Sequence, residues 1–359
     1  MLDLLPRALL IRKCQRLRDW VRIGVFSTVG FISLQCTITS APKKEKAPVT
    51  QPRTFLECCD ASAAVALDNH RFVVGDDETS VLRVYDWTRG GRPIQSFDLQ
   101  QFLNPKDGEG ETDIEAAAQL GDQVFWLTSH GKSQSGKARP DRNRLFATVF
   151  RTNETNVLME LIGKPYEKLL KDLVADPHLT QFGFRSATKR APKEDQSLNF
   201  EGLCATAQGN LLLGFRNPLV DGKALLIPLL NPLEITSGNA RASFGPPILL
   251  DLGGLTIRDL VSRAGSIYIL AGPWKGGQER RIYRWDGKSP QVELVTPITL
   301  DRFHSEALFA FPNQSPNLFT VLSDDGSRKA GDVPCKDLPI AQREFRGFEW
   351  RTLQIGNGE

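Results

Sequence analysis

The chain has 359 residues, of which 40% are hydrophobic and 24% are charged, a composition typical of a folded globular protein and not of a disordered one. Its formal net charge at pH 7 is only +3, and much of the positive excess comes from basic residues within the first 46 positions. Because no basic patch stands out in the rest of the chain, we expect no nucleic-acid partner.

The first 41 residues are expected to be an export signal. Basic residues precede Ile23–Leu34, an apolar run as long as a signal-peptide core and shorter than the ~20 residues of a transmembrane helix. Cleavage is favoured, and a lipid anchor on Cys36 or an uncleaved membrane anchor are the alternatives. Residues 42–56 are expected to be a solvated linker. We therefore expect a periplasmic or otherwise exported protein that touches a membrane only through an uncleaved or lipidated N-terminal segment.

Residues 57–359 are expected to form one β-propeller domain, because one pattern recurs in them five times. Each unit has a carboxylate, a short apolar strand, a tight turn, a second apolar strand and a polar cluster; Asn199–Pro218 is the clearest copy. The opening acids are Asp60, Glu115, Glu201, Asp259 and Glu306. Short strands repeated at this spacing are typical of propeller blades. We predict an all-β, five-bladed propeller, with a sixth blade hidden between Glu115 and Glu201 as the alternative.

The long gap between the second and third units contains a helical pattern. In Lys164–Pro177 the apolar residues Leu169, Leu170, Leu173 and Val174 recur at a spacing that places them on one helical face. This pattern predicts a small helical insertion at about 160–195, between blades two and three.

The opening acids are candidate metal ligands. The first strand of each blade lines the central channel of a propeller, so we expect these acids to meet at one mouth. Oxygen-rich sites of this type suit Ca²⁺. The alternative is that each acid caps a turn or pairs with an arginine such as Arg216 or Arg258. The acidic run from Asp107 to Glu115 lacks the EF-hand's closing glutamate and flanking helices, so we expect a solvated loop there.

A second set of polar residues follows the second strand of the units and is expected to form a binding surface. It consists of Asp76, Asp77, Arg216, Asn217, Asp324 and Asp325. His130 and His304 are candidate general bases, with an ordinary hydrogen-bonding role as the alternative for each. The chain contains no nucleophile elbow, P-loop, dinucleotide fingerprint or HExxH motif, so the enzyme classes with these signatures gain no support.

Four cysteines follow the signal: Cys58, Cys59, Cys204 and Cys335. In an oxidising compartment, a bond from Cys58 or Cys59 to Cys335 would join the start of the domain to its end. Cys204, inside a predicted strand, is equally well explained as a small buried apolar residue.

The segments DIEAAA, NFEGLC, IRDL and HSEAL resemble a bacterial propeller family of unknown function, usually exported or membrane-associated. The resemblance extends roughly from Glu57 to Leu353. More distantly, Glu201-Gly202 is similar to the first-strand motif of calcium-dependent lactonase-like propellers and of esterase-like phytases. In the lactonase-like enzymes that glutamate is a metal ligand, and only Glu201 matches it here.

Two functional hypotheses follow. The first is an exported propeller that binds an unknown small molecule or protein at an acidic channel mouth holding Ca²⁺. The alternative is a metal-dependent hydrolase of phosphoester or lactone substrates, with Glu201 and Glu306 among the ligands and His130 or His304 as the base.

Overall fold

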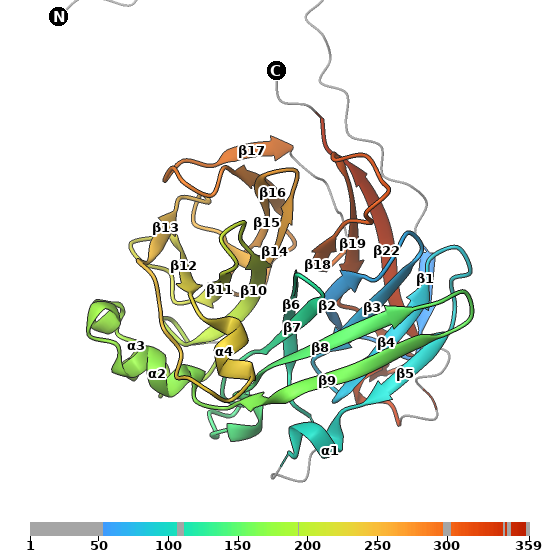
Figure 1. The fold of residues 1–359 in the computed structure, drawn as a ribbon, viewed down its shortest axis with the longest axis horizontal. Helices are drawn as coiled ribbons and strands as arrows, with labels where there is room; N and C mark the ends of the chain where they lie inside the picture. Colours follow the sequence, from blue (N-terminus) through green and yellow to red (C-terminus); the bar gives the residue numbers. More distant parts are fainter. Residues whose placement is uncertain are drawn as a thin grey trace, which may run out of the picture. The chain divides into compact units, whose positions relative to one another are not determined.

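The computed structural model describes residues 53–105, 111–192, 194–296, 303–339, 342 and 346–356. The predicted signal, Cys36, most of the predicted linker and Asp107 lie outside these residues. The described residues form five four-stranded antiparallel sheets and one two-stranded ribbon, an arrangement shown in Figure 1. The predicted five-bladed propeller is confirmed. No described helix is long and apolar enough to cross a membrane.

Each of the first four blades is built from consecutive strands. Blade one contains β2 (Ala61–Ala66), β3 (Arg71–Asp76), β4 (Val81–Asp86) and β5 (Gln95–Asp98). Blade two contains β6 (Ile114–Leu120), β7 (Gln123–Thr128), β8 (Leu145–Thr152) and β9 (Val157–Tyr166). Blade three contains β10 (Asn199–Ala205), β11 (Leu211–Asn217), β12 (Ala224–Leu229) and β13 (Ile248–Leu250). Blade four contains β14 (Thr256–Arg263), β15 (Ser266–Gly272), β16 (Arg281–Trp285) and β17 (Glu293–Thr296).

Blade five is completed by the start of the domain. It contains β18 (Ser305–Phe309), β19 (Leu318–Ser323), β22 (Gly347–Gln354) and β1 (Arg53–Leu56), with β1 as the outer strand. The last four residues of the predicted linker are therefore part of the sheet. Phe55 of β1 is fully buried and stacks on Phe348 of β22. Apolar packing therefore adds to the backbone hydrogen bonds between β1 and β22 in closing the propeller.

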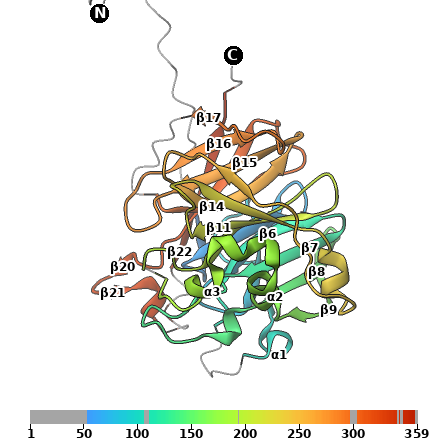
Figure 2. The same cartoon turned by 90° about the vertical axis from the view of Figure 1, so that its left-hand side faces the viewer.

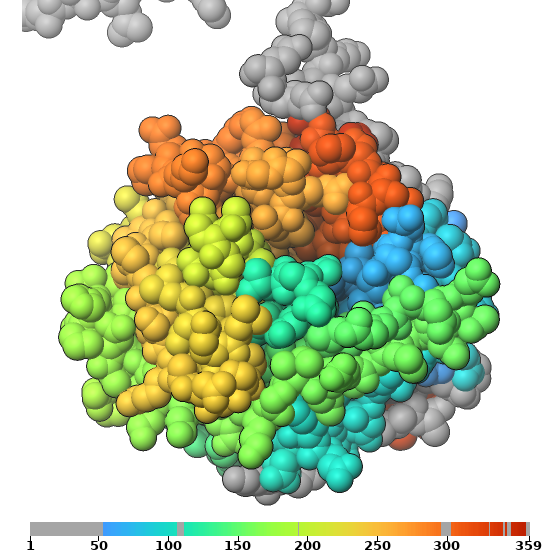
Figure 3. All heavy atoms as spheres, in the orientation of Figure 1, coloured from blue at the N-terminus to red at the C-terminus, as the bar shows by residue number. Residues whose placement is uncertain are grey.

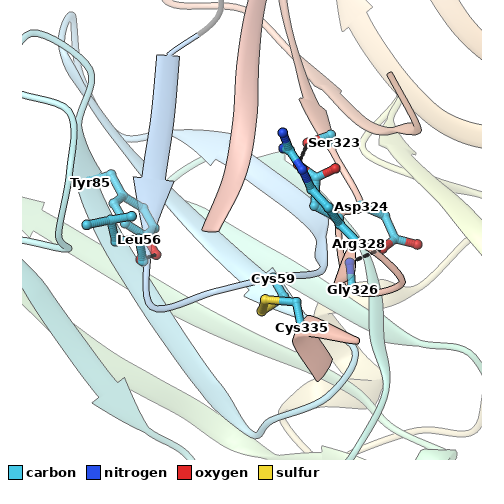
Figure 4. The surroundings of a disulfide bond; sticks show 9 residues. Leu56, Cys59, Tyr85, Ser323, Asp324, Gly326, Arg328 and Cys335 are labelled. Carbon is cyan, nitrogen blue, oxygen red and sulfur yellow. Dashed lines mark hydrogen bonds and ion pairs between the residues drawn. A yellow bond between two sulfur atoms is a disulfide. The ribbon is translucent and has the colours of Figure 1, made fainter. Parts of the chain in front are cut away.

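A disulfide between Cys59 and Cys335 joins the same two ends of the domain across 276 positions of sequence (Figure 4). Cys335 begins the short 3-10 helix η3 (Cys335–Asp337), which follows the ribbon of β20 (Lys329–Ala330) and β21 (Val333–Pro334). Of the two predicted partners for Cys335, Cys59 forms the bond and Cys58 is a buried free thiol. Cys204 is also free and buried, as its apolar interpretation predicted.

The predicted helical insertion between blades two and three is also present. It consists of α2 (Leu169–Ala175), η2 (Pro177–Phe182) and α3 (Phe184–Ala187), and Figure 2 shows α2 and α3 side by side. Its buried side chains pack with Phe200 and Phe215 of blade three, because the apolar face of α2 needs a partner surface. The other short helices are α1 (Gln100–Leu103), η1 (Pro140–Arg142) and α4 (Pro232–Thr236).

The inner strands form a closed ring in the order β2, β6, β10, β14, β18 and back to β2. At one end of the ring they enclose a hollow of about 150 Å³, lined by small and apolar residues from all five blades. Figure 3 shows the face of the molecule on which segments of the five blades meet. A Cβ at Gly202 would lie 2.7 Å from Cγ2 of Ile257, so the glycine of the Glu-Gly motif allows blades three and four to approach closely.

Candidate functional site

A β-bulge occurs near the start of each inner strand and gives a structural alignment of the blades. At each bulge one residue has no partner in the ladder to the second strand. These residues are Ser62, Glu115, Glu201, Arg258 and Glu306. The predicted ring of acids is thus corrected in two blades: Ser62 stands where Asp60 was expected, and Arg258 where Asp259 was expected.

Asp259 lies one residue after the bulge residue Arg258, and its carboxylate binds backbone groups. It accepts hydrogen bonds from the backbone N–H groups of Leu260 and Leu308, both at 2.7 Å, and so connects blade four to blade five. In the other blades small residues, such as Ala116 and Gly202, occupy this position. Both oxygens of Asp259 thus serve as backbone acceptors, and its role as a metal ligand stays a prediction.

Three arginines and two glutamates form one side of the channel mouth, which we call the arginine half: Arg216, Arg258, Arg280, Glu201 and Glu306. Nη1 of Arg258 donates to Glu201 at 2.9 Å and to Glu306 at 3.3 Å. Arg216 also donates to Glu201, and Nη2 of Arg280 donates to Glu306 at 3.1 Å. Glu201 and Glu306 are thus paired with arginines, as the alternative interpretation of the opening acids proposed.

Burial and the neighbouring charges shift the pKa values of Arg258 and Glu306 in opposite directions. Burial lowers the pKa of Arg258, but Glu201 and Glu306 outweigh it, so the net effect raises that pKa. The pKa of Glu306 is raised, chiefly by burial, although Arg258 opposes the change. A guanidinium that is 5% exposed therefore stays charged because both carboxylates face it.

Five carboxylates occupy the other side of the mouth, which we call the acidic half: Asp60, Asp77, Glu78, Asp113 and Glu115. Oxygen atoms of Asp60, Asp77 and Glu78 lie within 4.8 Å of one another, as do those of Asp77, Asp113 and Glu115. Asp77 belongs to both groups and joins them. Blade one contributes the first group, and the start of blade two contributes Asp113 and Glu115.

The acidic half is crowded with like charge. Burial, a hydrogen bond with Asp324 and the charge of Asp77 raise the pKa of Asp60 to about 12. Burial and neighbouring acids raise the pKa values of Asp77 and Glu115 well above those of exposed carboxyl groups. Oδ2 of Asp60, whose residue is 4% exposed, and Oδ1 of Asp77 are buried without a hydrogen-bond partner. Such oxygens favour either protons or a bound cation.

The two halves are in electrostatic contact through Glu115. Its pKa is raised first by burial, then by Asp113, Glu201, Asp77 and Glu306. Glu115 is therefore the member of the acidic half that borders the arginine half, since Glu201 occupies the same bulge position on the neighbouring strand β10. The mouth is polarised around the ring: most of its acids lie on blades one and two, where Arg142 pairs with Asp113, and the three guanidinium groups that hold Glu201 and Glu306 lie on blades three and four.

The loop that carries the disulfide lies against Asp60. A single antiparallel bridge pairs Asp60 with Asp324, and the backbone N–H of Asp325 donates to the carbonyl of Cys59 at 2.8 Å. A Cβ at Gly326 would lie 1.7 Å from Oδ1 of Asp60, so only glycine fits there. In the same loop Nζ of Lys336 lies 3.7 Å from Glu78. Closure of the propeller and construction of the acidic half thus depend on one loop.

The two predicted histidines lie in different surroundings. The ring of His130 is buried against Phe200, with 5.1 Å between ring centres, and its Nδ1 donates to the carbonyl of Thr128 at 2.8 Å. Burial lowers the pKa of His130 to about 4, so the ring is neutral at pH 7. His304 directly precedes β18, and its carbonyl accepts from the N–H of Asp324 at the acidic side of the mouth.

The predicted binding residues divide between structural and site positions. Asp76 accepts from Thr79 and pairs with Arg83, and Asp325 accepts from Ser323 at 2.7 Å. Asn217 is buried opposite Asn199 in the ladder. The structure brings Asp77, Asp324 and Arg216 to the mouth. For Asp113, which is buried and pairs with Arg142, the predicted solvated loop is corrected.

Sequence reasoning named Glu78 beside Asp76 and Asp77 but missed Asp113 and Arg280 as site residues. A signal for Asp113 was available, because it precedes its bulge residue by two positions, as Asp60, Asn199, Thr256 and His304 precede theirs. Arg280 follows a glycine-rich loop and lies outside the repeat pattern, so no such signal marks it.

The fold and the site can be compared with known proteins. One family model, described as Protein of unknown function (DUF3616), covers part of the chain. Residues 141–314 match this family. The predicted resemblance to a propeller family of unknown function is thereby confirmed. No curated protein matches the chain.

Solved structures of similar fold include three bacterial proteins. A glutaminyl cyclase of Myxococcus xanthus is 12% identical, with a TM-score of 0.45, covering 87% of this chain and 97% of its own. A putative glucose dehydrogenase of Thermus thermophilus is 10% identical, with a TM-score of 0.40, covering 86% and 100%. Virginiamycin B lyase of Staphylococcus aureus is 7% identical, with a TM-score of 0.36, covering 86% and 100%. None of these activities transfers to the chain at such identities.

Proposed function

We propose that this protein is an exported binding module that holds one divalent cation, Ca²⁺, in the acidic half of its channel mouth. The observation that carries the proposal is the pair of orphaned buried oxygens, Oδ2 of Asp60 and Oδ1 of Asp77, inside a group of five carboxylates. Native proteins rarely leave such atoms without a partner, and a bound ion can supply the partner that the protein itself lacks. The bound cation would present a ligand or partner with an open coordination position.

The chemistry of the donor set favours calcium over transition metals. All five groups of the acidic half are carboxylates, and hard oxygen ligands suit Ca²⁺ or Mg²⁺ better than zinc or copper. The groups come from two blades and several loops, a spread that fits the flexible geometry of Ca²⁺ better than the strict octahedron of Mg²⁺. We therefore place Ca²⁺ among Asp60, Asp77, Glu78, Asp113 and Glu115.

Export is part of the same proposal. The Cys59–Cys335 disulfide supports it, because stable disulfides are typical of the periplasm and of extracellular proteins. The basic and apolar N-terminal sequence supports it independently. Cell fractionation of the tagged full chain tests this part: recovery in the periplasm or medium supports export, and recovery only in the cytosol contradicts it.

The experiment for the cation site is calorimetric titration of the chelator-treated protein with CaCl₂. We expect one Ca²⁺ per chain and release of protons, because carboxyl groups of raised pKa must lose their protons to bind a cation. Asp77→Asn should abolish binding, since Asp77 belongs to both groups of acids. Equal calcium binding by Asp77→Asn and by the unaltered protein would contradict the proposal.

A metal-dependent hydrolase is the second candidate, and the position of His304 is the observation that favours it. His304 occupies the same place before its bulge as Asp60 and Asp113 do, so it belongs to the same mouth. A base beside a metal with an open position can activate water. A screen with phosphoester and lactone substrates in CaCl₂ tests this candidate. Turnover that is lost in His304→Gln, with calcium binding retained, would support it.

A further inference from the structure

The arginine half contains one guanidinium that is not fully used by the protein. Nε of Arg216 donates to the carbonyl of Trp274 at 3.2 Å, and Nη1 donates to Glu201. Nη2 has no hydrogen-bond partner among the described residues. The side chain is 25% exposed, whereas Arg258 and Arg280 are 5% and 4% exposed. Arg216 therefore presents a fixed N–H edge to the solvent at the mouth.

The charge of this region is in excess of what its glutamates neutralise. Three guanidinium groups face two carboxylates, Glu201 and Glu306. The open edge of the arginine half is thus positive.

We propose that the ligand of this mouth carries an oxyanion, a carboxylate or phosphoryl group, that bridges the bound cation and Nη2 of Arg216. The inference rests on the proposed calcium site and adds the chemical class of its ligand. Ca²⁺ accepts six to eight oxygens, so an oxyanion can complete its coordination. The planar guanidinium of arginine is well suited to the oxygens of such groups.

The polarised mouth explains why both halves are needed. The acidic half alone repels an anion, and a cation placed there reverses that repulsion. Glu115 and Glu201 join the two halves, because they occupy the same bulge position on the neighbouring inner strands β6 and β10. Arg258 and Arg280 serve a different purpose: they hold Glu201 and Glu306, and Glu201 in turn fixes Arg216.

The test is the binding of phenylphosphonate and of acetate to the calcium-loaded full-length protein, measured by titration calorimetry in low salt. We expect phenylphosphonate, acetate or both to bind, and we expect binding to weaken at least tenfold when calcium is removed. Arg216→Gln should weaken binding by about tenfold to a hundredfold, the loss that corresponds to one charge-assisted hydrogen bond. The affinity of Arg216→Lys should lie between those of the unaltered protein and Arg216→Gln, because lysine keeps the positive charge but lacks the planar pair of N–H donors of a guanidinium.

The matched control is Arg284→Gln, which removes an exposed arginine paired with Glu293 on blade four, away from the mouth. It should leave anion binding unchanged. Calcium binding is measured first on every sample, and far-ultraviolet circular dichroism checks folding. If no calcium binds to the unaltered protein, the proposed function fails. If calcium binds but neither anion does, or Arg216→Gln and the unaltered protein bind them equally, the oxyanion proposal alone is overturned.

Discussion

Asp77→Asn is the single substitution that should disturb the acidic half most, because Asp77 belongs to both of its groups of carboxylates. Asp77 lies within 4.8 Å of two different pairs of carboxylates, and its Oδ1 is buried without a partner. Asparagine keeps this buried group neutral without a bound proton, and the substitution removes a central calcium ligand. We expect the variant to be as stable as or more stable than the unaltered protein without calcium, and to gain nothing from calcium.

The size of the effect follows from linkage. A ligand present at a hundred times its Kd stabilises the folded state by about 2.7 kcal/mol. The unfolding entropy of a domain of about 300 residues is ~0.6 kcal/mol per degree, from ~2.1 cal/mol/K per residue. At 1 mM CaCl₂ and a Kd of about 10 μM, typical of sensor-type sites, the Tm should therefore rise by about 4 °C.

The stability of the protein should also depend on pH, which tests the same prediction in a second way. The folded-state pKa of Asp60 is raised from 3.8 to about 12, so above about pH 4 the folded state holds a proton that the unfolded state has lost. Stability of the calcium-free protein should therefore fall as pH rises from 5 to 8. Calcium replaces the proton, so its stabilising effect should be larger at pH 8 than at pH 5.

Differential scanning fluorimetry with and without 1 mM CaCl₂, at pH 5 and pH 8, measures all of these values. The matched control is Asp122→Asn, an exposed acid in the turn between β6 and β7, which should keep the full calcium shift. The reasoning is refuted if calcium does not raise the Tm of the unaltered protein, or if Asp77→Asn shows the same rise.

Three further predictions follow from the contacts of the mouth. Glu201→Gln should lower the free energy of unfolding by about 3–5 kcal/mol in urea titrations, because Arg258 loses a charged partner while buried; a loss below 1 kcal/mol would show that Glu306 suffices. The double variant Cys59→Ser and Cys335→Ser should lose about 2–5 kcal/mol of stability and bind calcium more weakly in calorimetry, and unchanged calcium affinity would speak against the placement of Asp60 by this loop. Gly326→Ala should abolish the calcium-dependent rise in Tm, because the added methyl group would displace the carboxylate 1.7 Å away, and a full rise in this variant would contradict that geometry.

The sequence predicted the architecture well because propeller blades repeat a strand pattern that survives wide variation in identity. Five units, the insertion before blade three and the bond to Cys335 could all be predicted from local pattern and spacing. The outer strand β1 could not, since Arg53–Leu56 has no repeat pattern of its own and is defined by pairing with β22, almost three hundred positions away.

The site was predicted only in outline, for a physical reason that β-bulges make clear. One extra residue in a strand changes which side chain faces the channel, so an alignment that is wrong by one position exchanges Arg258 for Asp259. The two have opposite charge, and the predicted ring of five acids therefore becomes a polarised mouth. Contacts between blades, such as Asp77 with Asp113, depend on loop paths that no repeat pattern specifies.

The most direct measurement of the central claim is an anomalous-difference map from crystals of the protein grown with CaCl₂ and soaked in MnCl₂, which substitutes for calcium at oxygen sites. We expect one strong peak at the channel mouth within about 2.6 Å of oxygens from Asp60, Asp77 and at least one of Asp113 and Glu115. Absence of a peak among these carboxylates in fully soaked crystals would contradict this expectation.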